Sequence, residues 1–340
     1  MTQLEMNRLN RNSVSLLNVR ESDAFMAKSN LTRLDIIQSY RVAEFVTLAR
    51  DGSPVCWPLA PDFEDGRLIF STGYVYPAKA RNAQRNPHVA VLFSDPTASS
   101  RTDDGPLVLV QGLAKVDDQD LQRNTERYVD QLLRKGPLML RVILRSHVLR
   151  QAFVGYLARI WIEVQPQREY VWARGQMLPE PLCIAIRPSS YSPGPGIELP
   201  QEVFKWLLNY QRLPVLAYLD QTGWPAMTRV QANVKDDHIT FESAIQAQAG
   251  APACLTYHRL VGNYLANDAF ILRGHFDDAN RLIPEKVVGY IGTKDDRGVG
   301  SIKAMRILLG YRKQLSQQLE KESRPLPIAR PTPRVVSENN

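Results

Sequence analysis

A short basic segment offers the clearest chemistry in the sequence. Lys79, Arg81 and Asn82 stand together in the run K-A-R-N, which opens a helix predicted over Ala78–Arg85. The free N–H groups and positive dipole end of a helix start favour a phosphate, and an arginine can hold two phosphate oxygens at once. Thr72, shortly before the helix, can donate a hydroxyl hydrogen bond. The segment predicts a phosphate site; the plainer alternative is a group of solvated surface cations.

Other reactive residue types are scattered. The cysteines, Cys56, Cys183 and Cys254, are far apart and form no C-x-x-C pair. We therefore expect reduced, mostly buried thiols, and neither a disulfide framework nor a metal site. No Ser/His/Asp triad, carboxylate pair or metal-ligand cluster stands out. No catalytic side chain is predicted.

The composition is that of a folded globular chain. It has 340 residues, 44% hydrophobic and 23% charged, which suits two domains of ordinary size. A net charge of +7 and a pI near 9.3 favour anionic partners such as phosphate ligands, nucleic acid or anionic lipid. Nucleic acid is not expected, because no zinc finger, RNA-binding aromatic signature or long Lys/Arg block is present.

Membrane and export signals are missing from the pattern. No apolar run approaches the roughly 20 residues that cross a bilayer. The first residues, Met1–Arg20, contain no apolar core of the signal-peptide kind. We therefore expect a cytoplasmic protein that is not integral to a membrane.

The basic segment lies within a series of short strands and tight turns. Asp51-Gly52 and Asp65-Gly66 are hairpin signals, and Gly112 marks a bulge. The strands predicted in the first half are Val42–Arg50, Pro54–Ala60, Arg67–Ser71, Val89–Phe93, Leu107–Val116 and Arg159–Val164. The helices predicted there, besides Ala78–Arg85, are Leu31–Tyr40, Gln119–Lys135 and Leu138–Leu157.

The predicted helix Leu138–Leu157 carries Arg141, Arg145 and Arg150 beside an apolar stripe. The simplest interpretation is an amphipathic helix that covers a barrel. Alternatively, its basic face grips an anionic ligand tail or a membrane surface, in which case the protein would be a peripheral or scaffold protein.

The second half repeats the first. R-D-G-S-P recurs as Q-T-G-W-P, so Gly52 matches Gly223 at a shift of 171 residues. Pro87–Leu92 resembles Pro252–Tyr257 at a shift of 165, and Gly112 matches Gly274 at 162. The shrinking shift indicates an internal duplication of an all-β unit with shorter loops in the second copy. The elements predicted in that copy are a helix at Glu202–Leu208, strands at Val215–Asp220, Ala226–Val234, His238–Ser243, Ala253–Tyr257 and Ala269–His275, and a helix at Gly300–Glu322.

These patterns predict a mainly β protein with helices, of the α+β class. Each half is expected to form a small antiparallel barrel, and the two barrels to pack as an intrachain pseudo-dimer with a pocket at their interface. The expected divisions are an N-terminal extension (1–30), a first barrel with two covering helices (31–182), a linker (183–198), a second, degenerate barrel with a C-terminal helix (199–322) and a disordered tail (323–340).

The order strand, D-G-x-P, strand, D-G-x-L-x-F-x-T, K-x-R-N and N-P-x-V resembles the FMN-binding split-barrel superfamily. That group includes pyridoxamine 5′-phosphate oxidase and the deazaflavin-dependent reductases. The resemblance covers about Leu31–Gly175 well and Leu199–Lys313 faintly. It implies two tandem split β-barrels and a cofactor, FMN or a deazaflavin coenzyme, with haem as a further option because some split-barrel relatives bind it.

The resemblance also implies which residues contact the cofactor. The strand after the first hairpin would lie against the flavin ring, and the end of the next strand would begin the phosphate loop. Lys79 has the spacing of the family's phosphate-binding lysine, and K-x-R-N is common in the deazaflavin branch. The implied cofactor-binding residues are Trp57, Pro58, Leu59, Ser71, Thr72, Lys79, Arg81, Asn82 and Trp172. For Trp172, core packing is an equal alternative.

Several positions depart from the family pattern. The oxidases have an arginine at the position of Trp57, and their Arg-x-His-x-Arg-like substrate signature does not follow Trp172. The second copy has no lysine matching Lys79, because Gln246–Gly250 fills that region. We therefore expect one cofactor site per chain, at the interface of the barrels. The second barrel would supply its wall through Arg229, Tyr257 and His258, although a structural role for His258 is an alternative.

The resemblance implies a flavin- or deazaflavin-dependent oxidoreductase that transfers hydride to or from a small planar or unsaturated substrate. The alternative is a non-enzymatic protein of the same fold that binds flavin or haem, with His258 or His88 as the axial ligand. The expected assembly is a monomeric pseudo-dimer or a homodimer.

Overall fold

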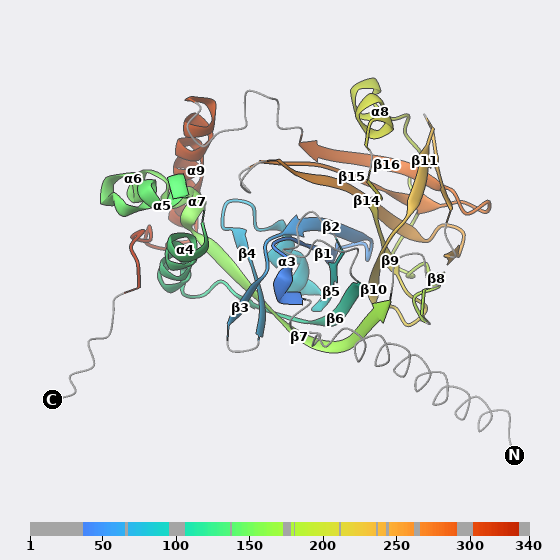
Figure 1. Cartoon of the computed structure of the whole chain (residues 1–340), viewed down its shortest axis with the longest axis horizontal. Coiled ribbons are helices and arrows are strands. Elements are labelled where there is room, and N and C mark those ends of the chain that lie inside the picture. The colour runs from blue at the N-terminus through green and yellow to red at the C-terminus, as the bar shows by residue number, and fades with distance from the viewer. Residues whose placement is uncertain are drawn as a thin grey trace, which may run out of the picture.

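The computed structural model describes residues 37–64, 67–94, 106–136, 138–172, 178–179, 181–210, 212–235, 237–242, 245–261, 266–290 and 302–332. These residues form two curled, seven-stranded antiparallel sheets with several helices at one side (Figure 1). The first sheet has the order β2-β1-β5-β6-β7-β4-β3, and the second has the order β10-β9-β14-β15-β16-β12-β11. The second order is the first with each strand replaced by its counterpart, which confirms the predicted α+β class and the duplication.

The elements have the following bounds. The first sheet contains β1 (Ala43–Leu48), β2 (Pro54–Leu59), β3 (Asp62–Glu64), β4 (Arg67–Gly73), β5 (His88–Phe93), β6 (Leu107–Asp117) and β7 (Arg159–Trp172). The second contains β9 (Val215–Leu219), β10 (Pro225–Arg229), β11 (Gln231–Val234), β12 (Ile239–Glu242), β14 (Pro252–Val261), β15 (Ala266–Phe276) and β16 (Leu282–Tyr290). A separate parallel pair contains β8 (Ile184–Ala185) and β13 (Gln246–Ala247). The helices are α3 (Ala78–Arg85), α4 (Leu121–Lys135), α5 (Leu138–Arg145), α6 (His147–Ala152), α7 (Val154–Leu157), α8 (Gln201–Leu208) and α9 (Ile302–Lys321).

The duplication extends to turns and bulges. The first hairpin of each barrel turns through a glycine in the left-handed region, Gly52 at φ 82° and Gly223 at φ 81°, where other residues are strained. The ladders shift register at Gly112 in one barrel and at Gly274 in the other. The match of Pro87–Leu92 with Pro252–Tyr257 was off by one residue. The strand registers pair Val89 with Gly112 and Ala253 with Gly274, so the counterpart of Val89 is Ala253 and not Cys254.

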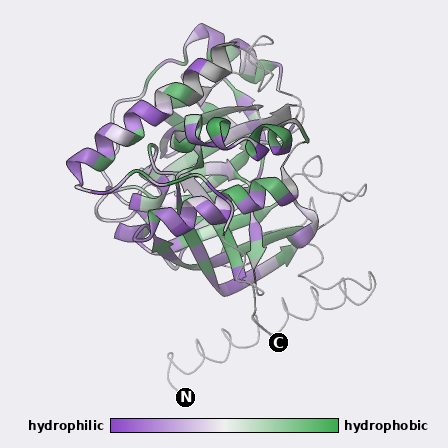
Figure 2. Ribbon diagram, turned by 90° about the vertical axis from the view of Figure 1, so that its left-hand side faces the viewer, coloured by the Kyte–Doolittle hydropathy of each residue, from purple (hydrophilic) through white to green (hydrophobic). Residues whose placement is uncertain are grey.

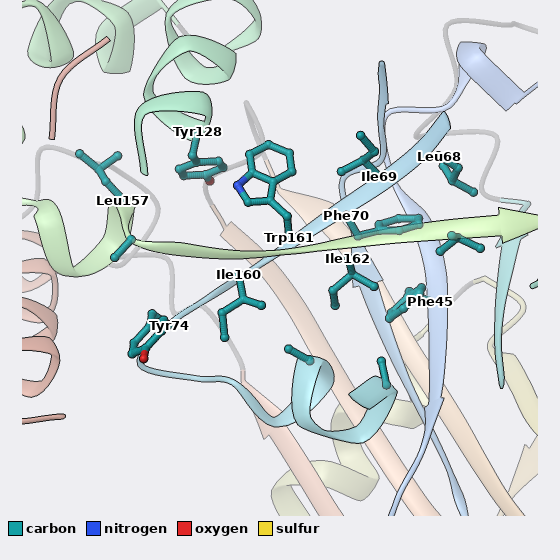
Figure 3. Close-up of a cluster of buried hydrophobic side chains, with 14 of the residues drawn as sticks. Phe45, Leu68, Ile69, Phe70, Tyr74, Tyr128, Leu157, Ile160, Trp161 and Ile162 are labelled. Atoms are coloured by element: carbon teal, nitrogen blue, oxygen red, sulfur yellow. The ribbon is translucent and has the colours of Figure 1, made fainter. Parts of the chain in front are cut away.

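Each barrel encloses an apolar core. In the first, side chains alternate along β7, so that Ile160 and Ile162 lie on one side of the strand and Trp161 lies on the other, toward Tyr128 (Figure 3). Phe45 and Phe70 meet in the same core, with ring centroids 4.8 Å apart. This packing fixes the ends of β4 and β7, which carry part of the candidate site.

A second apolar cluster joins the barrels. It includes Val46 and Cys56 from the first barrel and Met227 and Cys254 from the second. The sulfur atoms of Cys56 and Met227 lie 3.6 Å apart, and these two residues are 171 positions apart in the chain. Because that separation matches the repeat, counterpart residues meet here, as expected close to a pseudo-twofold axis. Cys56 and Cys254 are buried, as predicted, and Cys183 is half-buried.

The helical layer differs from the prediction. The expected single helix Leu138–Leu157 is three helices, α5, α6 and α7. Ser146 interrupts it with extended backbone, and its side chain accepts a hydrogen bond from Leu149 N to cap α6. In the second barrel, a tight turn at Asp277–Arg281 joins β15 to β16 directly. The segment α4–α7 is therefore an addition to the first barrel.

Two strands of the second barrel were also misjudged. The expected strand Ala226–Val234 is divided into β10 and β11, which pair with different neighbours. The strand β16 was not predicted at all, although it pairs with β15 over nearly its whole length. The strand β3 and the β8/β13 pair were missed as well.

The C-terminal segment packs on the first barrel. We expected α9 to belong to the second unit, but Leu315 and Leu319 are buried in the core of the first. The expected disordered tail is also wrong for Ser323–Thr332, because Arg324 donates to the Tyr74 hydroxyl at 2.9 Å and Ala329 is fully buried. The rest of that tail, 333–340, and the expected N-terminal extension and Leu31–Ile36 lie outside the described residues.

The segment expected to be a linker has ordered contacts. Tyr191 is buried, and its hydroxyl donates to Glu285 at 2.8 Å. Among the described helices, none is both long enough and apolar enough to span a bilayer.

Candidate functional site

Lys79 lies in the first turn of α3 and reaches back to β2. Its ammonium nitrogen stands 4.3 Å from the centroid of the Trp57 ring, in a cation–π contact. Pro77 precedes the helix and gives no side-chain cap to its first turn. Lys79 and Trp57, which the family resemblance associates with phosphate and ring, are thus brought together.

Arg159 is the second cation at this place. It begins β7 and is paired with Gly73, the last residue of β4. Its guanidinium carbon lies 4.2 Å from the centroid of the Tyr128 ring and 4.5 Å from that of Tyr156, and its Nη2 donates to the Tyr128 hydroxyl at 2.8 Å. We call Trp57, Lys79 and Arg159 the cationic corner.

The cationic corner has unsatisfied hydrogen-bond donors. Trp57 Nε1 and Arg159 Nε are buried and find no hydrogen-bond partner in the described part of the chain. Within the same residues, no carboxylate forms an ion pair with Lys79 or Arg159. Two enclosed cations without a counter-ion are costly in free energy, and an anionic ligand would remove that cost.

The pKa of Lys79 is lowered by these surroundings. Burial, and next the nearby Arg159 guanidinium, lower the pKa of Lys79 to about 8 from its ordinary 10.5. Lys79 therefore keeps most of its charge at pH 7 and loses it above about pH 8, and a bound anion would raise its pKa again.

The other residues of the basic segment have separate contacts. Arg81 is exposed. The Asn82 amide donates to Thr47 Oγ1 at 3.0 Å, which joins α3 to β1. The Thr72 hydroxyl is buried and donates to the Tyr76 carbonyl at 3.1 Å, and Ser71 is half-buried beside it. Of the basic segment, only Lys79 belongs to the cationic corner, whereas Asn82 and Thr72 form hydrogen bonds with Thr47 and Tyr76.

The remaining family-implied residues are divided between the first barrel and the seam between the barrels, and Leu59 packs on the core of the first barrel. Pro58 and Leu59 end β2 and are half-buried. Trp57 packs against the apolar cluster that joins the barrels, and Trp172 is buried within that cluster. Trp172 thus packs within the cluster, and its contact with a flavin stays a prediction.

Two of the three expected wall residues, Arg229 and His258, belong to a buried polar network. Arg229 and His258 both contact Glu44 of β1: Arg229 Nη2 donates to Glu44 Oε1, and His258 Nε2 lies 2.8 Å from the same oxygen. Ser94 Oγ donates to Glu44 Oε2 at 3.0 Å and accepts from Arg229 Nε at 2.8 Å. The Glu44 and His258 side chains are 0% and 1% exposed. We call these four residues the Glu44 network.

Arg229 of the Glu44 network occupies the position in the second barrel that Pro58 occupies in the first. β1 pairs Glu44 with Pro58, whereas β9 pairs Val215 with Arg229 in the same register position. The second barrel also has the short strand β13 in the chain position of α3. An arginine bound to a carboxylate, and no lysine-bearing helix, therefore replace the cradle of the first barrel.

Tyr257 and His88 have different surroundings again. Tyr257 lines a cavity of about 170 Å³ bounded by second-barrel residues, among them Tyr210 and Leu213, and its buried hydroxyl has no hydrogen-bond partner within the described chain. The His88 ring lies 4.2 Å from that of Trp224, centroid to centroid. Burial, and then Arg168, lower the pKa of His88.

One site residue was missed from the sequence. Arg159 was read only as the start of an alternating strand, and its role follows from the register that sets it beside Gly73. The available signal was an arginine placed directly after a helical segment, at the buried start of a strand. That signal is weak without the fold.

No protein-family model and no curated protein sequence matches this chain. Solved structures do resemble it. An F420 reductase is 18% identical over 39% of this chain and 92% of its own, with a TM-score of 0.28. A putative pyridoxamine 5′-phosphate oxidase from Listeria innocua is 18% identical over 41% and 93%, with a TM-score of 0.27. The haem storage protein HutZ from Vibrio cholerae is 13% identical over 42% and 91%, with a TM-score of 0.29.

Each of these matches spans less than half of this chain and nearly all of the other. That agrees with the strand order described above. The fold is a split barrel, present twice. Function is argued below from the cationic corner.

Proposed function

We propose that the first barrel binds a phosphate-bearing flavin or deazaflavin, and that the protein is an oxidoreductase. The single observation that carries the proposal is the cationic corner: Lys79 and Arg159 lie close together, enclosed, with no carboxylate partner among the described residues. A phosphate is the anion that two such cations and a helix start bind well.

The residues present fit the group. Trp57 Nε1 and Arg159 Nε are buried donors in need of an acceptor, and the flavin ring and phosphate offer several. Trp57, Pro58 and Leu59 are half-buried at the end of β2, and Trp57 packs on the cluster that joins the barrels. In this structure Lys79 covers the Trp57 ring, so the lysine side chain must swing away from the ring to admit a cofactor.

The cofactor would supply the hydride chemistry, and the protein would bind, orient and shield it. The corner residues would fix the phosphate end, and the apolar seam would exclude water from the ring. The substrate class remains the small planar or unsaturated molecule expected from the resemblance. Arg81 and Asn82 have lesser roles in this proposal, because one is exposed and the other is bound to Thr47.

The stoichiometry follows from the asymmetry of the barrels. In register, the first barrel pairs Pro58 with Glu44 and the second pairs Arg229 with Val215. Arg229 forms an ion pair with Glu44 across the interface. We expect one cofactor per chain. Titration of the protein with FMN, followed by quenching of the flavin fluorescence and by calorimetry, should saturate at one equivalent. If neither FMN nor a deazaflavin binds, the proposal fails.

The haem alternative has weaker support. It needs a free axial ligand, but His258 is bound to Glu44 and the His88 ring packs on Trp224 at an interplanar angle of 43°. A binding protein without catalysis would use the same cationic corner. It is distinguished from an enzyme by anaerobic reduction of the bound cofactor: in an oxidoreductase, an unsaturated acceptor should reoxidise the cofactor faster than it reoxidises free cofactor.

Affinity for the cofactor should depend on pH through Lys79. The lysine is charged below its pKa of about 8, and the second ionisation of a phosphate monoester, near 6, is complete above pH 7. Binding should therefore weaken as the pH rises from 7 to 9.5, by up to about tenfold per unit above the pKa. Lys79→Arg should bind with little change over that range, because arginine stays charged. A wild-type affinity that is flat from pH 7 to 9.5 would contradict a role for Lys79.

A further inference from the structure

The helices α5, α6 and α9 form one layer on the outer side of the first barrel. α9 crosses α7 at Gly155, where the backbone of Tyr311 and Arg312 leaves no room for a Cβ. Figure 2 looks onto this side of the molecule, on which hydrophobic and hydrophilic residues mix along the helices. We propose that this layer docks on an anionic membrane surface.

The charge of the chain is concentrated in this layer. The helices α5, α6 and α9 contain eight of the 42 Lys and Arg residues and one of the 35 Asp and Glu residues. The rest of the chain therefore has 34 basic and 34 acidic residues, whereas the whole chain has a net charge of +7. The positive charge of the protein belongs to one helical layer, and it is not a uniform property of the surface.

Large apolar side chains are exposed in the same layer. The exposed fractions are 69% for Leu138, 56% for Val142, 74% for Val148 and 45% for Leu309. Arg145, Arg306 and Arg312 are exposed between and beside them. Helices that lie at a lipid interface present this combination, in which apolar side chains enter the bilayer and arginines remain at the headgroups.

The chemistry selects an anionic bilayer over other partners. A nucleic acid would take the arginines but would leave Leu138 and Val148 in water. A second copy of this layer would place one surface with a net charge of +7 against another. An anionic lipid surface satisfies both features, since each nearby Lys or Arg adds roughly 1 kcal/mol of attraction.

The layer is also dispensable to the barrel itself. In the second barrel, the turn at Asp277–Arg281 replaces the segment that contains α5 and α6. The barrel thus closes without these helices, and a role in docking is consistent with an addition on one copy only.

The test is co-sedimentation of the full chain with vesicles. Vesicles of phosphatidylcholine alone are compared with vesicles that also contain phosphatidylserine. We expect binding to the anionic vesicles only, and weaker binding at high salt. Arg145→Gln with Arg306→Gln should lower the partition coefficient about tenfold or more, and Leu138→Ser with Val148→Ser should also lower it several-fold. All four side chains are exposed, so the fold should be unaffected.

Matched controls lie on the second barrel. Lys205→Gln with Lys235→Gln removes the same charge, and Leu208→Ser removes an apolar side chain that is 59% exposed on α8. These variants should bind vesicles like the wild type. The proposal is overturned if the control variants lose as much binding as the layer variants. Equal binding to the two kinds of vesicle, or binding to duplex DNA without binding to either, would also overturn it.

Discussion

Glu44→Gln should destabilise the protein by about 3–5 kcal/mol, the usual cost of removing one partner from a buried ion pair. Glu44 is 0% exposed and Arg229 is 4% exposed, so neither charge is screened by water. The substitution leaves the Arg229 guanidinium without its carboxylate, and the His258 ring nitrogen without a charged partner. Chemical denaturation at neutral pH, with the free energy of unfolding extrapolated to water, measures the loss.

A triple variant separates lost charge pairing from lost packing. Glu44→Val, Arg229→Met and His258→Leu together replace the charged and ring groups of the Glu44 network by apolar side chains and leave Ser94, and Val215 occupies the counterpart position of Glu44. Because apolar replacement of a whole buried network is often neutral, most of the stability should return. A loss below about 1 kcal/mol in Glu44→Gln would mean that the network is not the polar link between the barrels.

Under the proposed function, the Glu44 network gives a reason to expect one cofactor site per chain. Counterpart positions carry Pro58 against Glu44 in one barrel and Arg229 against Val215 in the other. The buried Arg229 is neutralised by the Glu44 carboxylate across the interface. If the proposed function holds, this ion pair occupies the second barrel's counterpart of Pro58, so that no second cofactor is expected there.

The fold was predictable because its turns are local. Gly52 and Gly223 need positive φ, and both lie in hairpins whose sequence signals are short and strong. Glycine is required at the bulges, Gly112 and Gly274, because another strand approaches closely there. A Cβ on Gly274 would lie 1.9 Å from the Ile283 carbonyl oxygen. The duplication was inferred largely from these four glycines, and the equivalent strand orders of the two sheets confirm it.

The candidate site was harder to predict because it depends on pairing between distant segments. The position of Lys79 in α3 followed from sequence, and its contact with Trp57 joins two elements implied by the family resemblance. Arg159 reaches the same corner only because β7 pairs with β4 across the inserted helices. Arg229 and His258 were expected at a cofactor wall, and nothing in the sequence indicates that Glu44 would bind both.

The C-terminal segment illustrates the same limit. Its prolines predicted disorder, but Arg330 pairs with Glu126 at 2.7 Å and Arg150 Nε donates to the Ala329 carbonyl at 2.9 Å. Composition measures what a segment can bury by itself. Composition does not indicate contacts with helices that lie about 200 residues earlier in the chain.

Lys79→Met should raise the stability of the ligand-free protein while weakening its binding of FMN. The folded-state pKa of Lys79 is about 8 and the unfolded value is near 10.5, so the unfolded chain binds more protons between these pH values. The buried charge therefore costs stability in full below pH 8, and the cost disappears as the pH rises toward 10.5. At pH 7 the gain in Lys79→Met should be about 1–3 kcal/mol, since one pKa unit corresponds to about 1.4 kcal/mol.

The two effects of Lys79→Met have opposite signs, and that makes the experiment decisive. Affinity for FMN should fall tenfold or more, because a charge-assisted contact to the phosphate is lost. Thermal unfolding of both proteins from pH 7 to 10.5 should show the stability difference shrinking above pH 8. Lys205→Met, on the exposed face of α8, should change neither property. If Lys79→Met instead lowers stability and leaves FMN affinity intact, the lysine is a packing residue on Trp57, and the phosphate must be bound elsewhere.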